Sequence, residues 1–249
     1  MRILCTNDDG LHSRGLELLT ELCAALGEVF CVAPDREQSA TSHSLTLHRP
    51  LRAIPRGHLR WQVDGTPTDC VVLALGALLT PPPDVVVAGI NHGPNMGEDV
   101  LYSGTVAAAM EAQILGVPGI AVSFAGSEYD LIPSHRDGVQ RLLRRILAVE
   151  RLPRQTLLNI NLPPIPGDAV RGVRVTTLGK RIYDGSLSRM KDPWGREIFW
   201  IGGGRLDWSG GDEVDFKAVE DGFISVTPLH ADLTGFELLE SVRSWRLGA

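Results

Sequence analysis

Two adjacent carboxylates follow the first apolar run of this chain. Residues 2–6 (RILCT) lead directly into the polar turn Asn7-Asp8-Asp9-Gly10. A run that is this short and ends in a turn predicts a buried strand. Neighbouring carboxylates at the end of a core strand are costly unless a positive group lies beside them. Asp8 and Asp9 are therefore candidates for binding a cation; the plainer alternative is a solvated turn whose aspartates cap the next helix.

Side chains with oxygen donors occur in two later loops, each placed after a predicted strand. Ser39 follows the strand at 28–34, and Asn91 and Asn95 follow the strand at 84–90, DVVVAGI. In parallel α/β sheets, ligands bind at the carboxyl ends of the strands, so we expect these side chains to converge on the aspartate pair. Carboxylates combined with hydroxyl and amide oxygens suit Mg²⁺ or Mn²⁺ better than zinc.

A further candidate site is the start of an alanine-rich helix predicted at about 105–115. Ser103-Gly104-Thr105 opens it, and a helix N-terminus offers free N–H groups and a positive dipole end to phosphate. Gly104 would let an anion approach the backbone closely. Taken alone, Ser103 is more often an ordinary N-cap. A metal site and an anion site on one edge together favour phosphoryl transfer or phosphate hydrolysis. His43 and His92 also lie in these loops, but lone loop histidines are more often incidental.

The first two thirds of the chain alternate between predicted strands and helices. The strands are 2–6, 28–34, 61–63, 84–90, 119–123 and 157–162, the helices 16–26, 69–79, 105–115 and 139–147, and 45–56 is expected to be extended at a sheet edge. This order predicts an α/β fold with a Rossmann-like, doubly wound and mostly parallel sheet.

Beyond residue 165 the pattern changes. Residues 173–178 alternate, 197–201 form a second strand-like run, and 191–196 (KDPWGR) read as a turn between them, which predicts a long hairpin. A helix at 214–220, a strand at 223–227 and a terminal helix at 235–247 follow. We therefore divide the chain into a metal- and phosphate-binding core, residues 1–165, and a C-terminal segment, 166–249, that carries a hairpin at about 180–201 and packs partly on the core.

Composition narrows the possible functions. The 249 residues are 43% hydrophobic and carry a net charge of -6, which argues against a nucleic-acid polymer as partner but not against small phosphorylated ligands. No run is long and apolar enough to span a membrane and no leader is visible, so a cytoplasmic location is expected. The four cysteines fall in apolar segments, which predicts buried free thiols. Dinucleotide, Walker A and G-x-S-x-G motifs are absent.

Long stretches of the chain resemble the SurE (survival protein E) family of 5′/3′-nucleotidases. They are MRILCTNDDG at the N-terminus, APDREQSATSHSLTL at 33–47, VDGTPTDCV at 63–71, AGINHGPNMGEDVLYSGTVAAAMEA at 88–112 and AVEDGFISVTPLHADLT at 218–234. The resemblance implies a metal-dependent phosphatase acting on nucleoside monophosphates. By matched position it places the metal ligands at Asp8, Asp9, Ser39 and Asn91, and the phosphate pocket at Asn95, Ser103, Gly104 and Thr105.

Our mechanistic hypothesis assigns catalysis to Asp8, Asp9 and Asn95 around one Mg²⁺ or Mn²⁺. Two alternatives stay open. A deacetylase-like metal hydrolase also has adjacent aspartates after its first strand, but it would need histidine ligands, and none lies beside this pair. A non-catalytic nucleotide-binding regulator could use the same fold, because a fold does not determine a function.

The hairpin predicts self-association. Its many large apolar side chains cannot be buried within a two-stranded ribbon. The resemblance likewise implies assembly through this hairpin, so a homodimer or a dimer of dimers is expected. The alternative is that the hairpin folds back over the terminal helix of its own chain.

Overall fold

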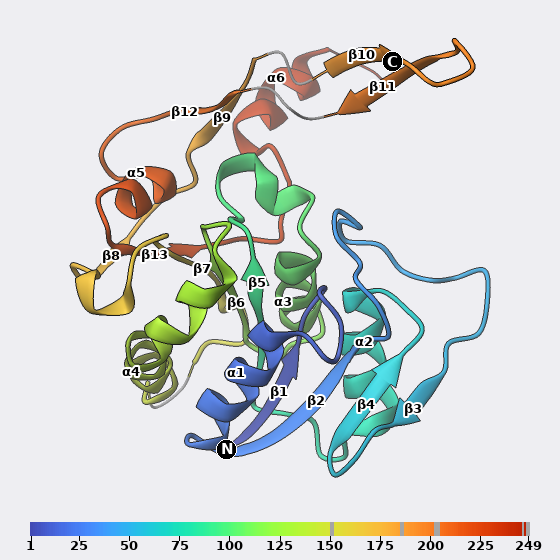
Figure 1. The fold of residues 1–249 in the computed structure, drawn as a ribbon, viewed down its shortest axis with the longest axis vertical. Coiled ribbons are helices and arrows are strands. Elements are labelled where there is room, and N and C mark those ends of the chain that lie inside the picture. Colours follow the sequence, from blue (N-terminus) through green and yellow to red (C-terminus); the bar gives the residue numbers. More distant parts are fainter. Residues whose placement is uncertain (150–151, 185–186, 202–204, 246, 248–249) are drawn as a thin grey trace.

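The computed structural model describes residues 1–149, 152–184, 187–201, 205–245 and 247. Nine strands form one sheet in the order β3-β4-β2-β1-β5-β6-β7-β13-β8 (Figure 1). Its parallel strands are β1 (Arg2–Thr6), β2 (Glu28–Pro34), β4 (Arg60–Val63), β5 (Val85–His92), β6 (Gly119–Phe124) and β7 (Leu157–Leu162). Within the region 45–56, expected to be extended at a sheet edge, only β3 (Ala53–Pro55) forms a strand, and it lies at the edge of the sheet, antiparallel to β4.

Helices cover both faces of this sheet. One core contains apolar side chains of α1 (Arg14–Ala24) and α4 (Arg136–Leu147); the other contains those of α2 (Pro67–Leu73) and α3 (Gly104–Ile114). Strand β1 contributes side chains to both cores: Ile3 and Cys5 point into the first and Leu4 into the second. The predicted doubly wound α/β fold is confirmed, and all four cysteines are free and buried.

The strand order creates a topological switch point at β1. Strand β1 has β2 on one side and β5 on the other, so the chain leaves β1 in one direction and later returns on the opposite side. The loops after these strands separate at such a switch point and leave room for a ligand. The aspartate pair, the loop with Ser39 and the last residues of β5, which include Asn91, meet at the carboxyl ends of these strands.

The helical segments differ from the sequence prediction in two ways. The apolar stretch predicted as one helix at 69–79 begins earlier, at Pro67, where Thr66 and Asp69 form a capping box, and after Leu73 it continues as a π-helix, Ala74–Leu78. Three 3₁₀ segments, η2 (Gly97–Leu101), η3 (Tyr129–His135) and η4 (Gly167–Ala169), lie in connections where no helix was predicted.

The C-terminal segment contributes to the main sheet and then leaves it. Strand β13 (Ile224–Pro228) pairs antiparallel with β7, and β8 (Val173–Val175) pairs parallel with β13. The alternating residues 173–178 had been predicted to form the first strand of the hairpin, and this is wrong. Val173–Val175 instead form the edge strand of the main sheet, and Thr177 pairs with Val214, the residue before α5 (Asp215–Glu220).

The predicted hairpin is present and longer than expected. Strands β9 (Lys180–Asp184) and β12 (Arg205–Ser209) pair antiparallel, and beyond them β10 (Leu187–Lys191) and β11 (Glu197–Ile201) pair around the predicted turn. We call this ribbon, residues 180–209, the arm; its residues 185–186 and 202–204 lie outside the described part. In Figure 1 the arm extends beyond the sheet domain.

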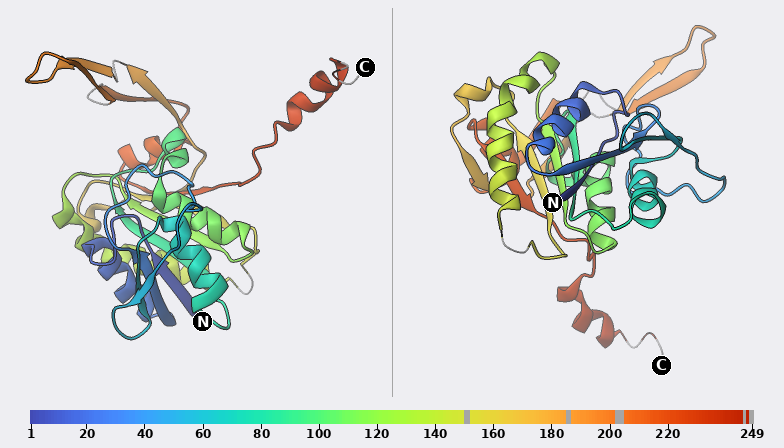
Figure 2. Two further views of the ribbon diagram at one scale, coloured as in Figure 1. Left: turned by 90° about the vertical axis from the view of Figure 1, so that its right-hand side faces the viewer. Right: turned by 90° about the horizontal axis from the view of Figure 1, so that it is seen from below.

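The chain ends in a second extension. The terminal helix predicted at 235–247 is shorter and consists of η5 (Phe236–Leu238) and α6 (Leu239–Ser244). Figure 2 shows the arm and α6 leaving the body in different directions, so among the described residues the arm is not covered by its own terminal helix. Both extensions expose large apolar side chains, among them Trp194, Phe199, Trp200, Ile201, Phe236 and Trp245. None of the described helices combines the length and hydrophobicity that crossing a bilayer requires.

Candidate active site

Asp8 lies at the carboxyl end of β1 and contacts the start of α3. Its side chain is buried, and Oδ1 accepts a hydrogen bond from the Thr105 hydroxyl. Burial raises the pKa of Asp8, while hydrogen bonds from the Thr105 hydroxyl and amide oppose that rise. The Asp8 carbonyl also accepts from the Gln38 amide, N···O 2.8 Å, and this bond ties the loop after β2 to the aspartate pair.

Gly104 is required by the closeness of α3 to Asp8. A Cβ atom at position 104 would lie 2.9 Å from the Asp8 Cβ, 3.0 Å from its Oδ2 and 3.2 Å from the Pro67 Cγ. Real Cβ contacts are seldom this short, so a side chain here would displace Asp8 or the helix. The sequence prediction assigned Gly104 to close approach of phosphate; the structure adds close approach of a carboxylate.

Asp9 offers a buried oxygen that is ready for a cation. Its Oδ2 is buried and has no hydrogen-bond partner among the described residues. Burial, the Asp8 carboxylate and the Glu37 carboxylate raise the pKa of Asp9 to about 7, and a hydrogen bond with the His92 backbone opposes this rise. An unpartnered buried carboxylate oxygen next to a second carboxylate is costly unless a cation compensates it. The site therefore fits a divalent metal ion.

Of the other two predicted metal ligands, Ser39 lies in the loop after β2, whereas Asn91, expected in the loop after residues 84–90, is still part of β5 and pairs with Ser123. The Ser39 hydroxyl donates to Glu37 Oε1 at 2.6 Å. The Asn91 amide nitrogen donates to the Gly93 carbonyl at 2.9 Å, which leaves the amide oxygen of Asn91 as the group that could reach a cation. Together with Asp8 and Asp9 this is an all-oxygen set.

Asn95 is held more firmly than its sequence position suggests. Its side-chain nitrogen donates to the Ser123 hydroxyl at 2.8 Å, and its backbone N–H donates to Asn161 Oδ1 at 2.9 Å. Its carbonyl accepts from both Asn159 and Asn161. The side-chain nitrogen of Asn95 carries two hydrogens, so one remains for a phosphate oxygen after the bond to Ser123.

Sequence reasoning missed three contributors to this region. Glu37 bonds Ser39 and raises the pKa of Asp9, and an exposed glutamate in a polar loop gave no reason to select it. Asn7 fixes the acidic turn by donating to the Ser13 hydroxyl at 2.7 Å and the Gly10 carbonyl at 3.1 Å. Tyr129 stacks on His92, with ring centroids 4.0 Å apart.

The described residues contain no group of three or more His, Cys, Asp and Glu side chains placed to hold a metal ion. The predicted set of two carboxylates, one hydroxyl and one amide therefore stays a prediction. His43 instead pairs with Glu111, N···O 2.7 Å.

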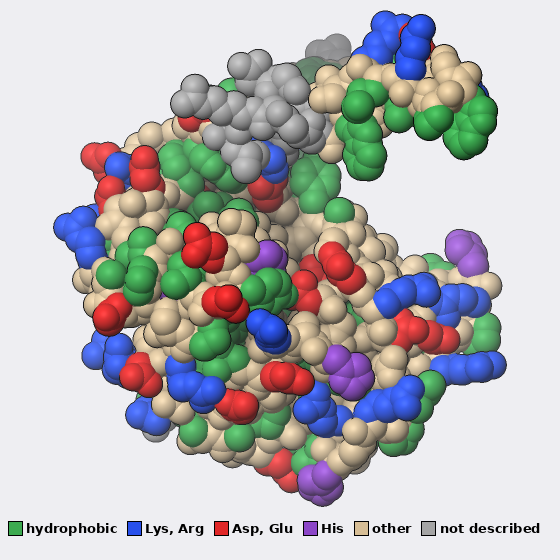
Figure 3. All heavy atoms as spheres, viewed as in Figure 1, with side chains coloured by type: hydrophobic (Ala, Val, Ile, Leu, Met, Phe, Trp, Pro, Cys, Tyr) green, Lys and Arg blue, Asp and Glu red, His purple; other side chains and the backbone are tan. Residues whose placement is uncertain are grey.

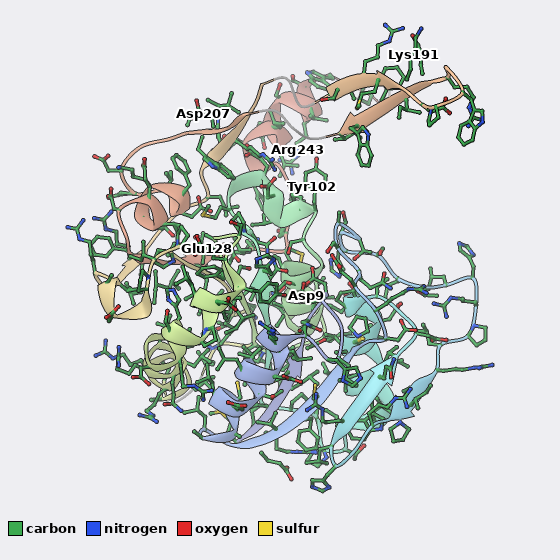
Figure 4. All side chains as sticks on the ribbon, viewed as in Figure 1. Asp9, Tyr102, Glu128, Lys191, Asp207 and Arg243 are labelled. Carbon is green, nitrogen blue, oxygen red and sulfur yellow. The ribbon has the colours of Figure 1, made fainter. Side chains whose placement is uncertain are left out.

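Figure 4 shows Asp9 at the centre of the molecule, below Tyr102. A cavity of about 860 Å³ lies at the amino ends of the strands, where Arg2 and Val85 line it, and none of the predicted site residues does.

We expect Asp9→Asn to stabilise the metal-free protein at high pH. The folded-state pKa of Asp9 is raised to about 7, whereas an aspartate in the unfolded chain titrates near 3.9. Folding therefore favours protonated Asp9, and its contribution to stability is lost as the pH rises through about 7. With EDTA present, the Tm of the variant should exceed that of the wild type at about pH 8, and the gap should narrow as the pH falls below about 7 and vanish near about pH 4. Equal Tm differences across this range would contradict the raised pKa.

We expect Ser103→Ala to lower stability by about 1 kcal/mol, because the Ser103 hydroxyl caps α3 by accepting from the Val106 amide at 3.1 Å. If Ser103 also binds phosphate, activity below the Tm should fall as well. Thr66→Val is the control, because Thr66 caps α2 in the same way. Equal activities in the two variants would show that Ser103 caps α3 and does not bind phosphate.

Known proteins match this chain over nearly its whole length. Residues 3–185 match the family model described as survival protein SurE. A curated 5′-nucleotidase SurE of Gemmatimonas aurantiaca is 58% identical over 248 residues, 98% of each chain. That of Geotalea uraniireducens is 48% identical and spans 99% of this chain and all of its own. The crystal structure of the SurE protein from Aquifex aeolicus superimposes with a TM-score of 0.89 at 40% identity, covering 98% of this chain and 99% of its own.

Proposed function

The chain belongs to the survival protein SurE family, and from this premise we propose that it hydrolyses nucleoside monophosphates to nucleoside and phosphate with one bound Mg²⁺ or Mn²⁺. The nucleotidase class rests on relatives of high identity over nearly the whole chain, all named 5′-nucleotidase SurE. Metal dependence and action on 3′-nucleotides are our extension. We also propose a cytoplasmic location.

One observation carries the metal dependence. The buried Oδ2 of Asp9, which has no hydrogen-bond partner in the described part of the chain, lies next to Asp8, and Asp8 accepts a hydrogen bond from Thr105 at the start of α3. Asp8, Asp9, Ser39 and Asn91 would hold the cation. When bound, a divalent ion neutralises phosphate charge and lowers the pKa of a bound water.

The residues of this chain then have separate tasks. The Thr105 hydroxyl fixes the orientation of Asp8, and the bond from the Gln38 amide keeps the loop of Ser39 close. The second side-chain hydrogen of Asn95 and the N–H groups at the start of α3 would hold the phosphate oxygens. Because Asn95 is bonded at both its backbone and its side chain, it is preorganised for this role.

The proposal is tested by phosphate release from a panel of 5′- and 3′-nucleoside monophosphates, with EDTA and then with added Mn²⁺ or Mg²⁺. We expect release only with the metal. Nucleotide binding without release would favour the non-catalytic regulator. Deacetylation without phosphate release would favour the deacetylase-like hydrolase.

We further propose that the arm joins two copies of the chain, as a homodimer or within a dimer of dimers. Strands β10 and β11 expose Leu187, Met190, Phe199 and Trp200, which no other described part of the chain covers. Figure 3 shows apolar side chains of the arm facing open space beside the body. A patch of this kind is typical of a protein interface.

Removing the outer arm should give a monomer. Asp184 and Arg205 lie opposite each other in the register of β9 and β12, so residues 185–204 can be replaced by an Asn-Gly turn without disturbing the inner strands. Light scattering should then report one chain, with the Tm of the sheet domain retained. The control variant Asp168→Asn changes an exposed residue of η4, outside the arm, and should leave self-association as in the wild type. A wild type that already scatters as a monomer at micromolar concentration rules the interface out.

A further inference from the structure

A buried carboxylate lies at the foot of the arm, apart from the aspartate pair. Asp215 is the first residue of α5 and is fully buried. Its Oδ2 accepts from the Gly97 amide at 2.8 Å, and its Oδ1 accepts from the Gly179 and Phe216 amides at 2.9 Å each. One side chain thus ties together three segments that are far apart in the sequence. Charge-assisted bonds of this kind are about twice as strong as neutral ones.

The first two of these segments touch backbone to backbone. Gly97 has a φ of +53°, and a Cβ atom there would lie 2.8 Å from the Gly179 carbonyl oxygen and 2.9 Å from the Trp208 ring. A Cβ atom at Gly179 would lie 2.4 Å from the Phe216 ring. Glycine at both positions lets η2 pack directly on the residues where the arm begins.

Further bonds join η2 to β9. The Arg181 amide donates to Glu98 Oε2 at 2.6 Å, and the Arg181 guanidinium forms an ion pair with Asp99. Trp208 of β12 stacks on Phe216 of α5, with ring centroids 5.5 Å apart. The foot of the arm, α5 and η2 therefore form one contact.

Segment η2 lies between the two parts of the predicted phosphate pocket. Asn95 precedes it by two residues and is fixed to Ser123 and Asn161; Ser103 and Gly104 follow it and begin α3. The Tyr102 carbonyl in the same connection accepts from the Ser42 amide, in the loop that carries Ser39. A shift of η2 would therefore move the start of α3 relative to Asn95.

We infer that Asp215 is a positioning residue for phosphate: by holding η2 against the foot of the arm, it sets the place of the α3 N-terminus. This inference rests on the proposed phosphatase function. The arm would then affect the site as well as assembly, because the strands at its foot also hold η2, the segment that connects Asn95 to the start of α3.

Two variants test the contact from its two sides. Asp215→Asn puts an N–H donor where amides point, and Asp99→Asn weakens the ion pair with Arg181 at a partly exposed position that the fold should tolerate. Amide hydrogen exchange of a peptide spanning residues 97–106 should speed up in both, with exchange in β1 unchanged. This readout requires no assumption about catalysis.

Ligand binding gives the second readout. Inorganic phosphate is titrated into the Mn²⁺-loaded protein, and Mn²⁺ into the metal-free protein. Phosphate affinity should fall roughly tenfold in Asp215→Asn, within the range for coupling through a packed network, and Mn²⁺ affinity should stay within twofold of the wild type. A purely structural role for Asp215 would lower the Tm and leave both affinities unchanged below it.

Asp212→Asn is the matched control, because Asp212 is exposed and lies three residues before Asp215 in the same connection. It should leave exchange and both affinities as in the wild type. An active wild type whose phosphate affinity and exchange are unchanged in both test variants overturns the inference but not the proposed function. If Asp215→Asn does not fold, unchanged exchange and phosphate affinity in Asp99→Asn alone overturn the inference. A wild type that neither binds nor releases phosphate overturns both.

Discussion

Asp8→Asn and Asp9→Asn are each expected to abolish measurable Mn²⁺ binding and nucleotide hydrolysis. The predicted ligand set holds only these two charges; the Ser39 hydroxyl and the Asn91 amide are neutral and bind divalent ions weakly by themselves. Asp9 also contributes the buried oxygen that has no hydrogen-bond partner among the described residues. Changes outside the ligand shell already cost about 10- to 100-fold in metal affinity, so the loss of a charged ligand should exceed about 100-fold.

Titration calorimetry with Mn²⁺ is the measurement, and Tm separates lost binding from lost folding. Asp9→Asn should keep or raise the Tm of the metal-free protein while binding disappears. Asp8→Asn also alters the acceptor of the Thr105 hydroxyl, so a small decrease in Tm is expected there. Asp168→Asn is the control, because Asp168 lies exposed in η4. Unchanged Mn²⁺ affinity in both aspartate variants would contradict the proposed metal site.

The sheet domain could be predicted because its strands and helices are buried in patterns that the sequence displays directly. Strand β5 is a continuous β-branched run because both of its faces are covered, and α1 shows apolar residues at helical spacing because one stripe faces the first core. The turn chemistry at Asp192–Arg196 likewise predicted a hairpin, since Asp192 accepts from the amides of Trp194 and Arg196.

The borders of the C-terminal segment could not be predicted for a physical reason. Strand β8 is short and half exposed, and the same alternation suits an edge strand of the main sheet or one side of a hairpin. The choice between them depends on the partner β13, which lies about 50 residues further along the chain and whose pairing has no local sequence pattern. Residues 173–178 were assigned to the hairpin for this reason, whereas the start of the arm at Lys180 agrees with the predicted hairpin at about 180–201.

In the candidate site, too, some features follow from local sequence patterns and others depend on distant partners. Residue types and their positions after strands selected Asp8, Asp9, Ser39 and Asn91, because strand order brings those loops together. The bonds that orient the pocket are long-range: Thr105 to Asp8 and Asn95 to Asn161 join residues more than 60 positions apart. Such pairs depend on side-chain directions in the folded chain, which the order of elements does not specify.

Gly104→Val should disable the site as severely as the loss of a carboxylate, and for a steric reason. Its Cβ would lie 2.9 Å from the Cβ of Asp8 and 3.2 Å from the Pro67 Cγ, so Asp8, α2 or the start of α3 must move. Displacing Asp8 affects metal binding, and displacing α3 affects phosphate binding. Misplacement by about 1 Å can cost about 100-fold in rate, so kcat/KM should fall by at least about that factor.

A graded series makes this prediction sharp. Gly104→Ala introduces only the Cβ and should give an intermediate loss, because the smaller group demands a smaller shift. Overpacking costs about 1–3 kcal/mol, so Tm should also fall, and activity must be measured well below it. Gly76→Val is the matched control: Gly76 lies in the π-helical turn after α2, with nothing within 4 Å of its added Cβ. Wild-type activity in Gly104→Val, or an equal loss in Gly76→Val, would show that the close approach of α3 to Asp8 is not what the site requires.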